Sequence, residues 1–154
     1  GYEDSLAAQA VLISFIPMLM GTGGNSGAQA STAVIRSISL GDVEPKDAFA
    51  VLWKEWRVSL MAGASLAAVN FIKMNLVDRM LLNNPSVTLI VAATVSISII
   101  FIVMFAKVVG SLLPILAEKI GVDPAVMANP LISTITDTVS LMIYFFIARI
   151  LLHL

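Results

Sequence analysis

Four long stretches of apolar residues follow one another along the chain, and short polar connections separate them. Each stretch reaches the ~20 residues that an α-helix needs to cross a bilayer. The predicted membrane segments are residues 6–40, 56–76, 87–120 and 125–152. The connections contain residues typical of turns and helix ends, in LGDVEPKDA (40–48), LLNNPS (81–86) and GVDP (121–124). This pattern predicts an all-α integral membrane protein, a polytopic helical bundle.

The composition supports a membrane protein and excludes several other classes. The chain is 58% hydrophobic and 12% charged, whereas soluble domains are about 45–50% apolar and about 25% charged. The net charge of −1 provides no basic surface for nucleic acid, and the absence of Cys excludes disulfides and thiolate metal sites. Four spans leave no room in 154 residues for a soluble domain of ordinary size, so residues 1–154 are interpreted as one transmembrane domain.

A glycine-rich polar stretch, MGTGGNSGAQAST at 20–32, interrupts the first segment. Its glycines are Gly21, Gly23, Gly24 and Gly27. Irregular backbone at membrane depth is tolerated only where it is buried in protein or lines a water-filled cavity. We therefore predict a long first helix that is broken at these glycines. The alternative is that small residues allow close helix packing, but Asn25 and Gln29 favour the first interpretation because packing requires smallness and not amide groups.

Asp137 is the one carboxylate near the middle of a predicted span. An Asp at a helix centre costs about 2.5–3.5 kcal/mol to insert into a membrane, so it requires a compensating contact or a use. The other carboxylates lie at the chain start, in connections or at segment ends, and no Lys or Arg lies deep enough in its own segment to be an obvious partner. Lys54 and Glu55 are interpreted as a solvated pair at the membrane interface, anchored by Trp53 and Trp56.

Polar side chains follow one face of the predicted fourth helix. Asn129, Ser133 and Asp137 are spaced i, i+4, i+8, and Ser140 and Tyr144 continue the line. Such a line offers oxygen atoms to a cation whose water is partly removed or constrained, as an ion pathway requires. The alternative is a structural Asp137 whose carboxyl is satisfied by hydroxyls on neighbouring helices.

The available ligands are hard oxygens, because the chain has no Cys and its one His is His153. They favour Mg²⁺, Ca²⁺, Mn²⁺ or Na⁺ over zinc or copper. One Asp per chain supplies a single carboxylate, which is few charged ligands for a dication. We therefore predict a homodimer in which two chains meet on a two-fold axis with the pore near it. An enzyme is not predicted, because the sequence has no HExxH helix, no second membrane acid and no Lys-Ser/Thr after its glycine-rich stretch.

Three stretches resemble the transmembrane domain of the MgtE family of magnesium channels. They are PMLMGTGGNSGAQAST (17–32), GVDPAVMANPLISTITD (121–137) and SLMIYFFIARILL (140–152). The resemblance implies a homodimer that conducts Mg²⁺, with Mn²⁺ or Ca²⁺ as surrogates, through a pore between the first and fourth segments. It implies that Asp137 holds the hydrated ion. The pore-lining residues would be Asn129, Ser133, Gly21, Gly23, Gly24, Asn25 and Gly27.

Members of this family carry five transmembrane helices after a cytoplasmic regulatory region. Only four segments are recognised in this sequence, so we expect that the regulatory domains and the first helix of the family are absent from it. Lys and Arg are more numerous around the connections at 40–48 and 121–124 than on the opposite side, which predicts that these connections are cytoplasmic. The expected location is the plasma membrane, as a multi-pass protein of a bacterial or archaeal inner membrane.

The sequence also allows two functions other than a channel. The first is a divalent-cation secondary transporter, because a discontinuous helix with polar residues near the bilayer midplane is also typical of carriers. A structural membrane subunit is the other, in which Asp137 would play no part in ion binding.

Overall fold

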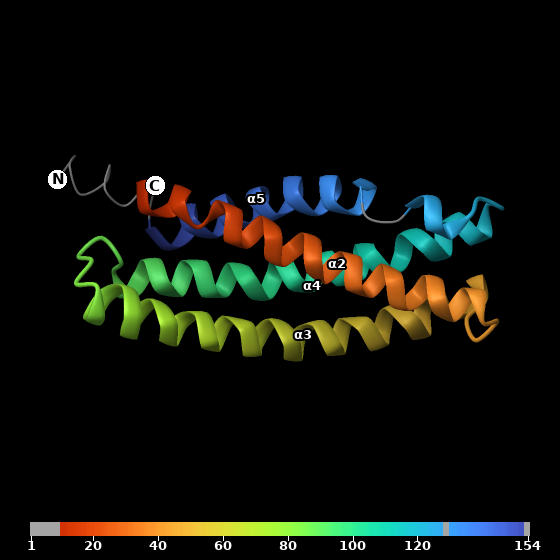
Figure 1. Cartoon of the computed structure of the whole chain (residues 1–154), viewed down its shortest axis with the longest axis horizontal. Helices are drawn as coiled ribbons and strands as arrows, with labels where there is room; N and C mark the ends of the chain where they lie inside the picture. The colour runs from red at the N-terminus through yellow and green to blue at the C-terminus, as the bar shows by residue number, and fades with distance from the viewer. Residues whose placement is uncertain (1–9, 128–129, 153–154) are drawn as a thin grey trace.

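Four long helices form the part of the chain that the computed structural model describes, residues 10–127 and 130–152. They are α2 (Ile16–Ser39), α3 (Ala48–Lys73), α4 (Leu89–Lys119) and α5 (Pro130–Leu152). Two 3₁₀-helices, η1 (Pro45–Asp47) and η3 (Pro124–Met127), precede α3 and α5, and a π-helix, η2 (Met74–Leu81), extends α3. The long helices run along a common direction, with the connections at 40–47 and 120–124 at one end and that at 82–88 at the other (Figure 1).

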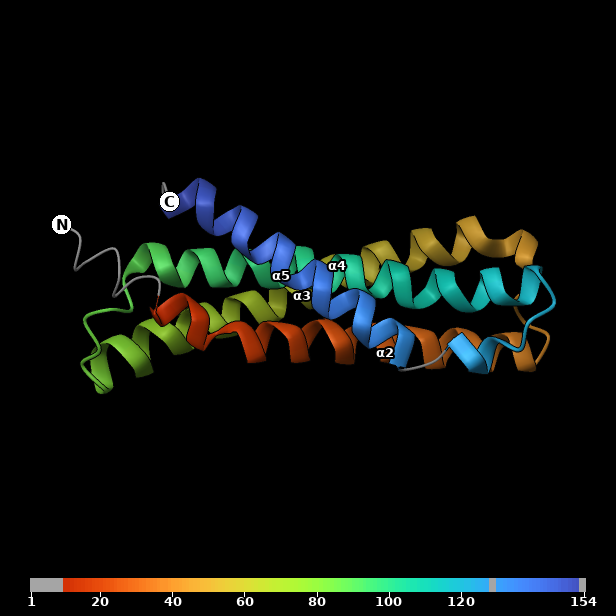
Figure 2. The same ribbon diagram turned by 90° about the horizontal axis from the view of Figure 1, so that it is seen from above.

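The helix α4 lies at the centre of the bundle. It contacts α2, α3 and α5, while α5 also packs on α2 and crosses the other helices obliquely (Figure 2). The most apolar 18-residue stretch of α4 has a mean hydropathy of 2.8, against 1.4 for Pro45–Leu81 and 1.7 for Pro130–Leu152. The buried residues of α4 cover most of the helix surface, while Ile97 and Phe101 remain exposed on one side, which is the pattern expected of a helix largely enclosed by others.

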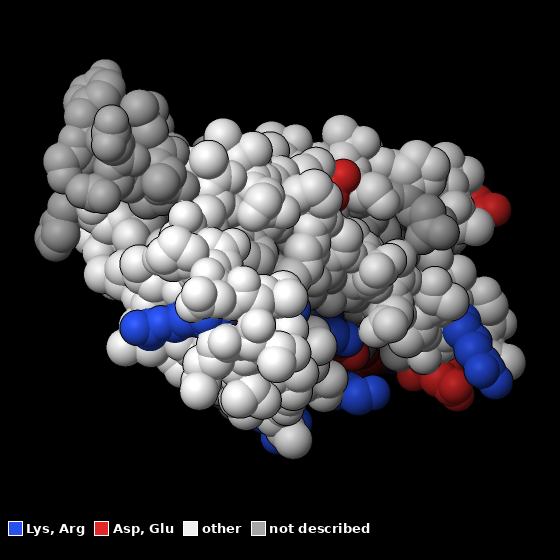
Figure 3. All heavy atoms as spheres, turned by 60° about the vertical axis from the view of Figure 1, so that its left-hand side comes forward, with Lys and Arg blue, Asp and Glu red and all other residues white. Residues whose placement is uncertain are grey.

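Three helical stretches in the described part of the chain are long and apolar enough to cross a membrane. They are Pro45–Leu81, Leu89–Lys119 and Pro130–Leu152. The 24-residue α2 is long enough but is not among them, because small and polar residues fill its middle. Large apolar side chains such as those of Met61, Val69 and Phe146 are exposed on the outside. Most of the face shown in Figure 3 is uncharged, as expected for a surface that contacts lipid.

The predicted break in the first helix at Gly21–Gly27 is wrong, because α2 is a continuous α-helix through all four glycines. The chain instead turns at Phe15, between helical residues 10–14 and the start of α2. Pro17 stands in the first turn of α2, where its missing N–H breaks no hydrogen bond of the helix that follows but does not allow the preceding helix to continue.

Close packing explains why Gly23 and Gly27 are buried within the regular helix α2. A Cβ atom at Gly27 would lie 2.8 Å from Ile132 Cγ2 and 3.1 Å from the carbonyl oxygen of Ala106. A Cβ atom at Gly110 of α4 would overlap the carbonyl group of Gly27. The α2 backbone therefore approaches α4 and α5 as closely as small residues allow, which is the packing alternative that the sequence left open.

Replacing Gly110 by Ala is expected to push α2 away from α4 and to destabilise the bundle. Overpacking in a well-packed core costs about 1–3 kcal/mol, and here the added methyl group meets backbone that has no rotamer to change. Thermal unfolding in detergent, followed by circular dichroism, measures the loss. Gly21→Ala is the matched control, because its Cβ would meet no atom within 4 Å; equal unfolding temperatures for the two variants would contradict the prediction.

A row of small and polar residues forms the buried face of α3. Glu55, Ser59, Gly63 and Ala67 recur every four residues and are buried. A Cβ atom at Gly63 would lie 3.1 Å from Ile100 Cα, so α3 and α4 are also in close backbone contact. At the far end of the bundle, the Tyr144 hydroxyl donates a 2.9 Å hydrogen bond to the carbonyl oxygen of Leu12 and ties α5 to residues 10–14.

The interpretation of Glu55 as half of a solvated surface pair is wrong. The helix α3 begins at Ala48 and not at residue 56, so Glu55 lies within it. Glu55 Oε2 is 3.7 Å from Lys107 Nζ of α4, and only 11% and 13% of the two side chains are exposed. Lys107 is far from both ends of α4, so a basic residue does lie deep in a span, but its partner is Glu55 and not Asp137.

Candidate functional site

The Asp137 side chain faces an open groove between α2 and α5. The groove has a volume of about 360 Å³ and is lined by Met20, Gly21, Gly24, Asn25, Ala28, Ser133 and Asp137. A Cβ atom at Gly24 would lie 3.8 Å from Asp137 Oδ1 and 3.9 Å from Ser133 Oγ. The absence of a side chain at Gly24 thus leaves space directly beside the carboxylate and the hydroxyl.

Helical periodicity brings these side chains together. Gly21, Gly24 and Ala28 are three and four residues apart and share one face of α2, and Ser133 lies one turn before Asp137 on α5. The packing of α2 against α5 then places the two faces side by side.

The structure brings together five of the eight residues predicted for the site, namely Gly21, Gly24, Asn25, Ser133 and Asp137. Gly23 and Gly27 do not line the groove; they are buried on the packed face of α2, because α4 and α5 approach them there. Asn129 lies outside the described residues.

The polar line predicted along α5 divides at Asp137. Ser140 and Tyr144 turn into the helix bundle, where Ser140 Oγ would lie 2.7 Å from a Cβ atom at Gly23, and both residues are buried. The groove therefore receives only the Ser133–Asp137 part of the line within the described residues.

Neighbouring threonines do not satisfy the Asp137 carboxylate. Thr134, Thr136 and Thr138 donate their hydroxyl hydrogens to carbonyl oxygens one turn earlier in α5, at 2.8–2.9 Å. The ion pairs found among residues 10–127 and 130–152 are Lys46–Glu44, Lys73–Asp78 and Lys107–Glu55, and none includes Asp137. The half-buried carboxylate is thus available to a ligand in the groove.

The donor set suits a hydrated hard cation. It combines a carboxylate with the Ser133 hydroxyl and the Asn25 amide, all oxygen ligands that Mg²⁺ and similar ions accept. Within the described part of the chain, no three His, Cys, Asp or Glu side chains are grouped closely enough to hold a metal ion. One chain therefore offers a site at which a dication would retain most of its water.

A second hollow continues the groove along α2. It has a volume of about 540 Å³, and its lining residues are Asn25, Ala28, Gln29, Thr32, Ala33 and Arg36. Asn25 and Ala28 line both hollows, so polar surface extends from Asp137 to the last turn of α2. Thr32 and Arg36 were not predicted to belong to the site, although their spacing from Asn25, i+7 and i+11, places them on the same helix face.

The fold and the site together define a helical membrane protein with a carboxylate in a polar groove. The family model of MgtE, described as "Divalent cation transporter", matches residues 16–147. The chain belongs to this family. As a member of a transporter family it is a membrane protein and not an enzyme.

Individual relatives agree with the family match. The chain is 38% identical over 153 residues to "Magnesium transporter MgtE" of Thermus thermophilus and 33% identical over 152 residues to the protein of the same name in Bacillus subtilis. Both alignments cover 99% of this chain and 32% of the relative. The chain thus spans about a third of the length of these curated relatives.

Proposed function

We propose that this chain forms the ion-conducting part of a magnesium channel and that Mg²⁺ passes through the groove beside Asp137. The observation that carries the proposal is the half-buried Asp137 carboxylate, which faces an open, glycine-lined groove rather than a partner side chain. Six waters at ~30 Å³ each occupy roughly 180 Å³, so the groove of about 360 Å³ has room for a fully hydrated ion. Mg²⁺ in particular sheds its water reluctantly.

The choice of Mg²⁺ among hard cations rests on the relatives, which carry the name magnesium transporter. Mn²⁺ and Ca²⁺ are expected to enter the same oxygen-lined groove as surrogates. The proposed location is a plasma membrane, which the chain crosses several times, with the connections at 40–47 and 120–124 on the cytoplasmic side. These two connections lie at the same end of the bundle (Figure 1), as the positive-inside count requires.

We further propose that two copies of the chain close the groove between them. Gly21 and Asn25 are exposed on α2 at the depth of the apolar spans. Polar groups that face hydrocarbon are costly, whereas polar groups that face a second groove would line a water-filled path. A two-fold axis beside α2 and α5 would also place two Asp137 carboxylates around one ion.

A channel is favoured over a carrier. The carrier alternative depended on a helix broken at the glycines, and α2 is continuous there. The two mechanisms differ in electrical behaviour, because a channel passes current down a gradient without a coupling ion. A structural subunit without ion binding remains the outcome if Asp137 binds no cation.

Crystals soaked in Mn²⁺ test the proposal directly. Anomalous diffraction is expected to show a peak between the Asp137 carboxylates of two copies, on a two-fold axis beside α2. This experiment measures occupancy and does not require that a chain of this length conducts. A well-ordered dimer with no peak near Asp137 would overturn the proposal, and a peak in a single groove without a second copy would overturn its dimeric part.

Gly24→Ala is expected to weaken Mn²⁺ binding about tenfold, which corresponds to about 1.4 kcal/mol. The added methyl group fits at ordinary contact distance, 3.8 Å from Asp137 Oδ1, but takes the place of water that the ion would retain. Mn²⁺ electron paramagnetic resonance titration of the purified protein measures the change. Ser65→Thr adds one methyl group at an exposed position of α3 that does not line the groove, so it serves as the control and should bind within about twofold of the parent; equal affinities for the two variants would contradict the prediction.

A further inference from the structure

A third hollow, also partly polar, lies at the end of the bundle where α3 passes into η2. It is separate from the Asp137 groove and shares no lining residue with it. Its volume is about 230 Å³, and it is lined by Val11, Ser14, Phe15, Lys73, Asp78, Leu82, Asn84 and Val87. The candidate span Pro45–Leu81 ends and α4 begins at Leu89 beside this hollow, so in the proposed membrane arrangement the hollow lies near the polar headgroups.

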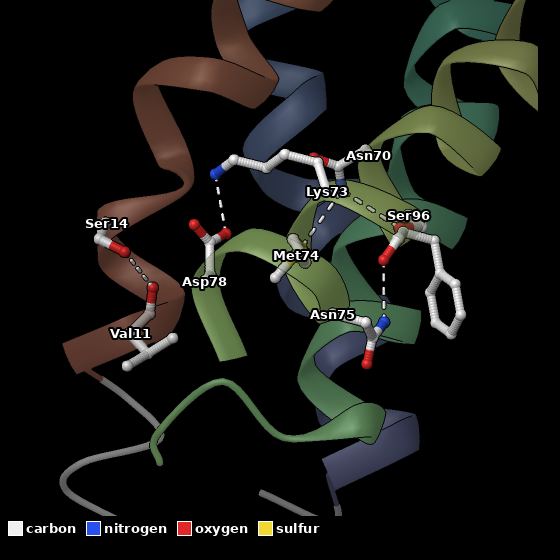
Figure 4. Close-up of polar contacts among 9 residues, drawn as sticks. Val11, Ser14, Asn70, Lys73, Met74, Asn75, Asp78 and Ser96 are labelled. Carbon is white, nitrogen blue, oxygen red and sulfur yellow. Dashed lines mark hydrogen bonds and ion pairs between the residues drawn. The ribbon is translucent and has the colours of Figure 1, made fainter. Parts of the chain in front are cut away.

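An ion pair forms the polar wall of this hollow (Figure 4). Lys73 Nζ lies 2.8 Å from Asp78 Oδ2, and the two side chains are 51% and 15% exposed. The wide turns of η2 return Asp78 to Lys73, five residues earlier in the chain. π-helical turns often occur at functional sites, and this one places a cation and an anion side by side in a hollow.

Hydrogen bonds at the end of α3 hold this arrangement. Asn70 Nδ2 donates to Ser96 Oγ of α4 at 3.1 Å and also lies 3.3 Å from Met74 Sδ. Asn75 Nδ2 donates to the carbonyl oxygen of Phe71 at 2.8 Å. The start of η2 is therefore fixed to α4, and the position of Lys73 does not depend on its ion pair alone.

The charges of the hollow complement a zwitterion. An ammonium group has three N–H donors, and Lys73 uses one on Asp78, so two remain for an anion. Asn84 Oδ1 accepts a hydrogen bond from the backbone N–H of Ser86 at 3.1 Å, which leaves the amide NH₂ group able to donate. Asp78 keeps a second carboxylate oxygen for a cationic group. A dianionic ligand would be repelled by Asp78.

The surroundings favour a lipid over a free small molecule. Leu76, Met80 and Leu81 of η2 are 57%, 72% and 76% exposed, an apolar surface that would contact acyl chains next to the hollow. Half of the lining residues of the hollow are also apolar. We propose that this hollow binds the headgroup of a zwitterionic phospholipid, with the phosphate on Lys73 and Asn84 and the primary amine of an ethanolamine-type headgroup beside Asp78.

Native mass spectrometry of the full chain in detergent tests this site with phosphatidylethanolamine and phosphatidylglycerol as probes. The parent protein is expected to retain phosphatidylethanolamine in preference to phosphatidylglycerol. Lys73→Gln is expected to lower this retention about tenfold and Asn84→Ala several-fold. Asp78→Asn is expected to abolish the preference between the two lipids, because it removes the partner of the amine and the charge that opposes an anionic headgroup.

Arg79→Gln is the matched control, because it removes an exposed positive charge from the same π-helix without touching the hollow. It should retain phosphatidylethanolamine like the parent. Equal losses in Lys73→Gln and Arg79→Gln would overturn the proposal in favour of general surface charge, and displacement of the lipid by excess inorganic phosphate would overturn it in favour of a free anion. Should Lys73→Gln unfold, Asn84→Ala decides, because Asn84 is exposed and outside the ion pair. Lipid retention is read without added Mg²⁺, so its result is independent of the proposed channel.

Discussion

Asp137→Asn is expected to weaken Mg²⁺ or Mn²⁺ binding by about a hundredfold, which corresponds to about 2.7 kcal/mol. The substitution keeps the size of the side chain and one oxygen ligand but removes the negative charge from the groove. Two unit charges about 4 Å apart attract by about 4 kcal/mol at an effective dielectric constant of about 20, and a dication doubles this value. Water retained by the ion increases its distance from the carboxylate, and desolvation of both charges opposes their attraction. The expected loss of binding free energy is therefore smaller than this Coulomb energy.

Asp42→Asn is the control for this prediction, since it removes the same charge from an exposed connection between α2 and α3. It should leave Mn²⁺ affinity unchanged within about twofold. Asp137→Asn should also unfold at the temperature of the parent, because no ion pair among the described residues includes Asp137. Unchanged Mn²⁺ affinity in a folded Asp137→Asn variant would leave Asp137 with a structural role and remove the basis of the proposed pathway.

The number and order of the long helices were predictable from the sequence, but the starts of α2 and α3 were not. Runs of about 20 apolar residues and the turn residues between them arise from the same physics, because backbone groups in hydrocarbon must pair within a helix and reversals require polar, flexible residues. The predicted 87–120 segment corresponds to Leu89–Lys119. The predicted 125–152 segment is shorter in the structure, since η3 takes its first turn and α5 begins at Pro130.

The shape of α2 was not predictable from its glycines alone. A glycine-rich stretch in a membrane helix is consistent with a break and also with close packing, and only the neighbouring helices decide between them. Gly110 and Ala106 of α4 come within contact of Gly27, and this partner surface is more than 70 residues away in the sequence. The polar amide at Asn25, which favoured a break, instead lies on the opposite, open face of an intact helix.

The burial of Glu55 on α3 could have been predicted from the spacing of small residues after it, although the apolar pattern did not indicate it. Glu55 stands four residues before Ser59, which is followed at the same spacing by Gly63 and Ala67. Small residues at this spacing mark a packed helix face in membranes, and an acid in line with them is therefore a candidate for burial. The charged sequence WKEWR interrupts the apolar stretch, so the predicted segment began at residue 56 and excluded Glu55. Lys107 could not be identified as its partner without the packing of α3 on α4.

Lys107→Met is expected to destabilise the bundle by about 3–5 kcal/mol, because it leaves the Glu55 carboxylate buried without its partner. Glu55→Gln is expected to destabilise it for the complementary reason. The two charges are 3.7 Å apart and mostly shielded from solvent, so the cost of desolvating either charge is offset chiefly by the other. Denaturant titration in detergent micelles measures these changes in the free energy of unfolding.

The double variant Glu55→Gln/Lys107→Met is expected to recover most of the loss, because no unpaired charge remains and replacing a buried pair by neutral groups is often nearly neutral. Lys54→Met is the control: Lys54 neighbours Glu55 but is exposed and outside the pair, so its effect should stay within about 0.5 kcal/mol. A loss in Lys107→Met no greater than that in Lys54→Met would contradict the pairing. Additive losses in the double variant would instead show that each side chain stabilises the bundle through contacts other than their mutual attraction, and would leave the depth of Lys107 in α4 without an electrostatic explanation.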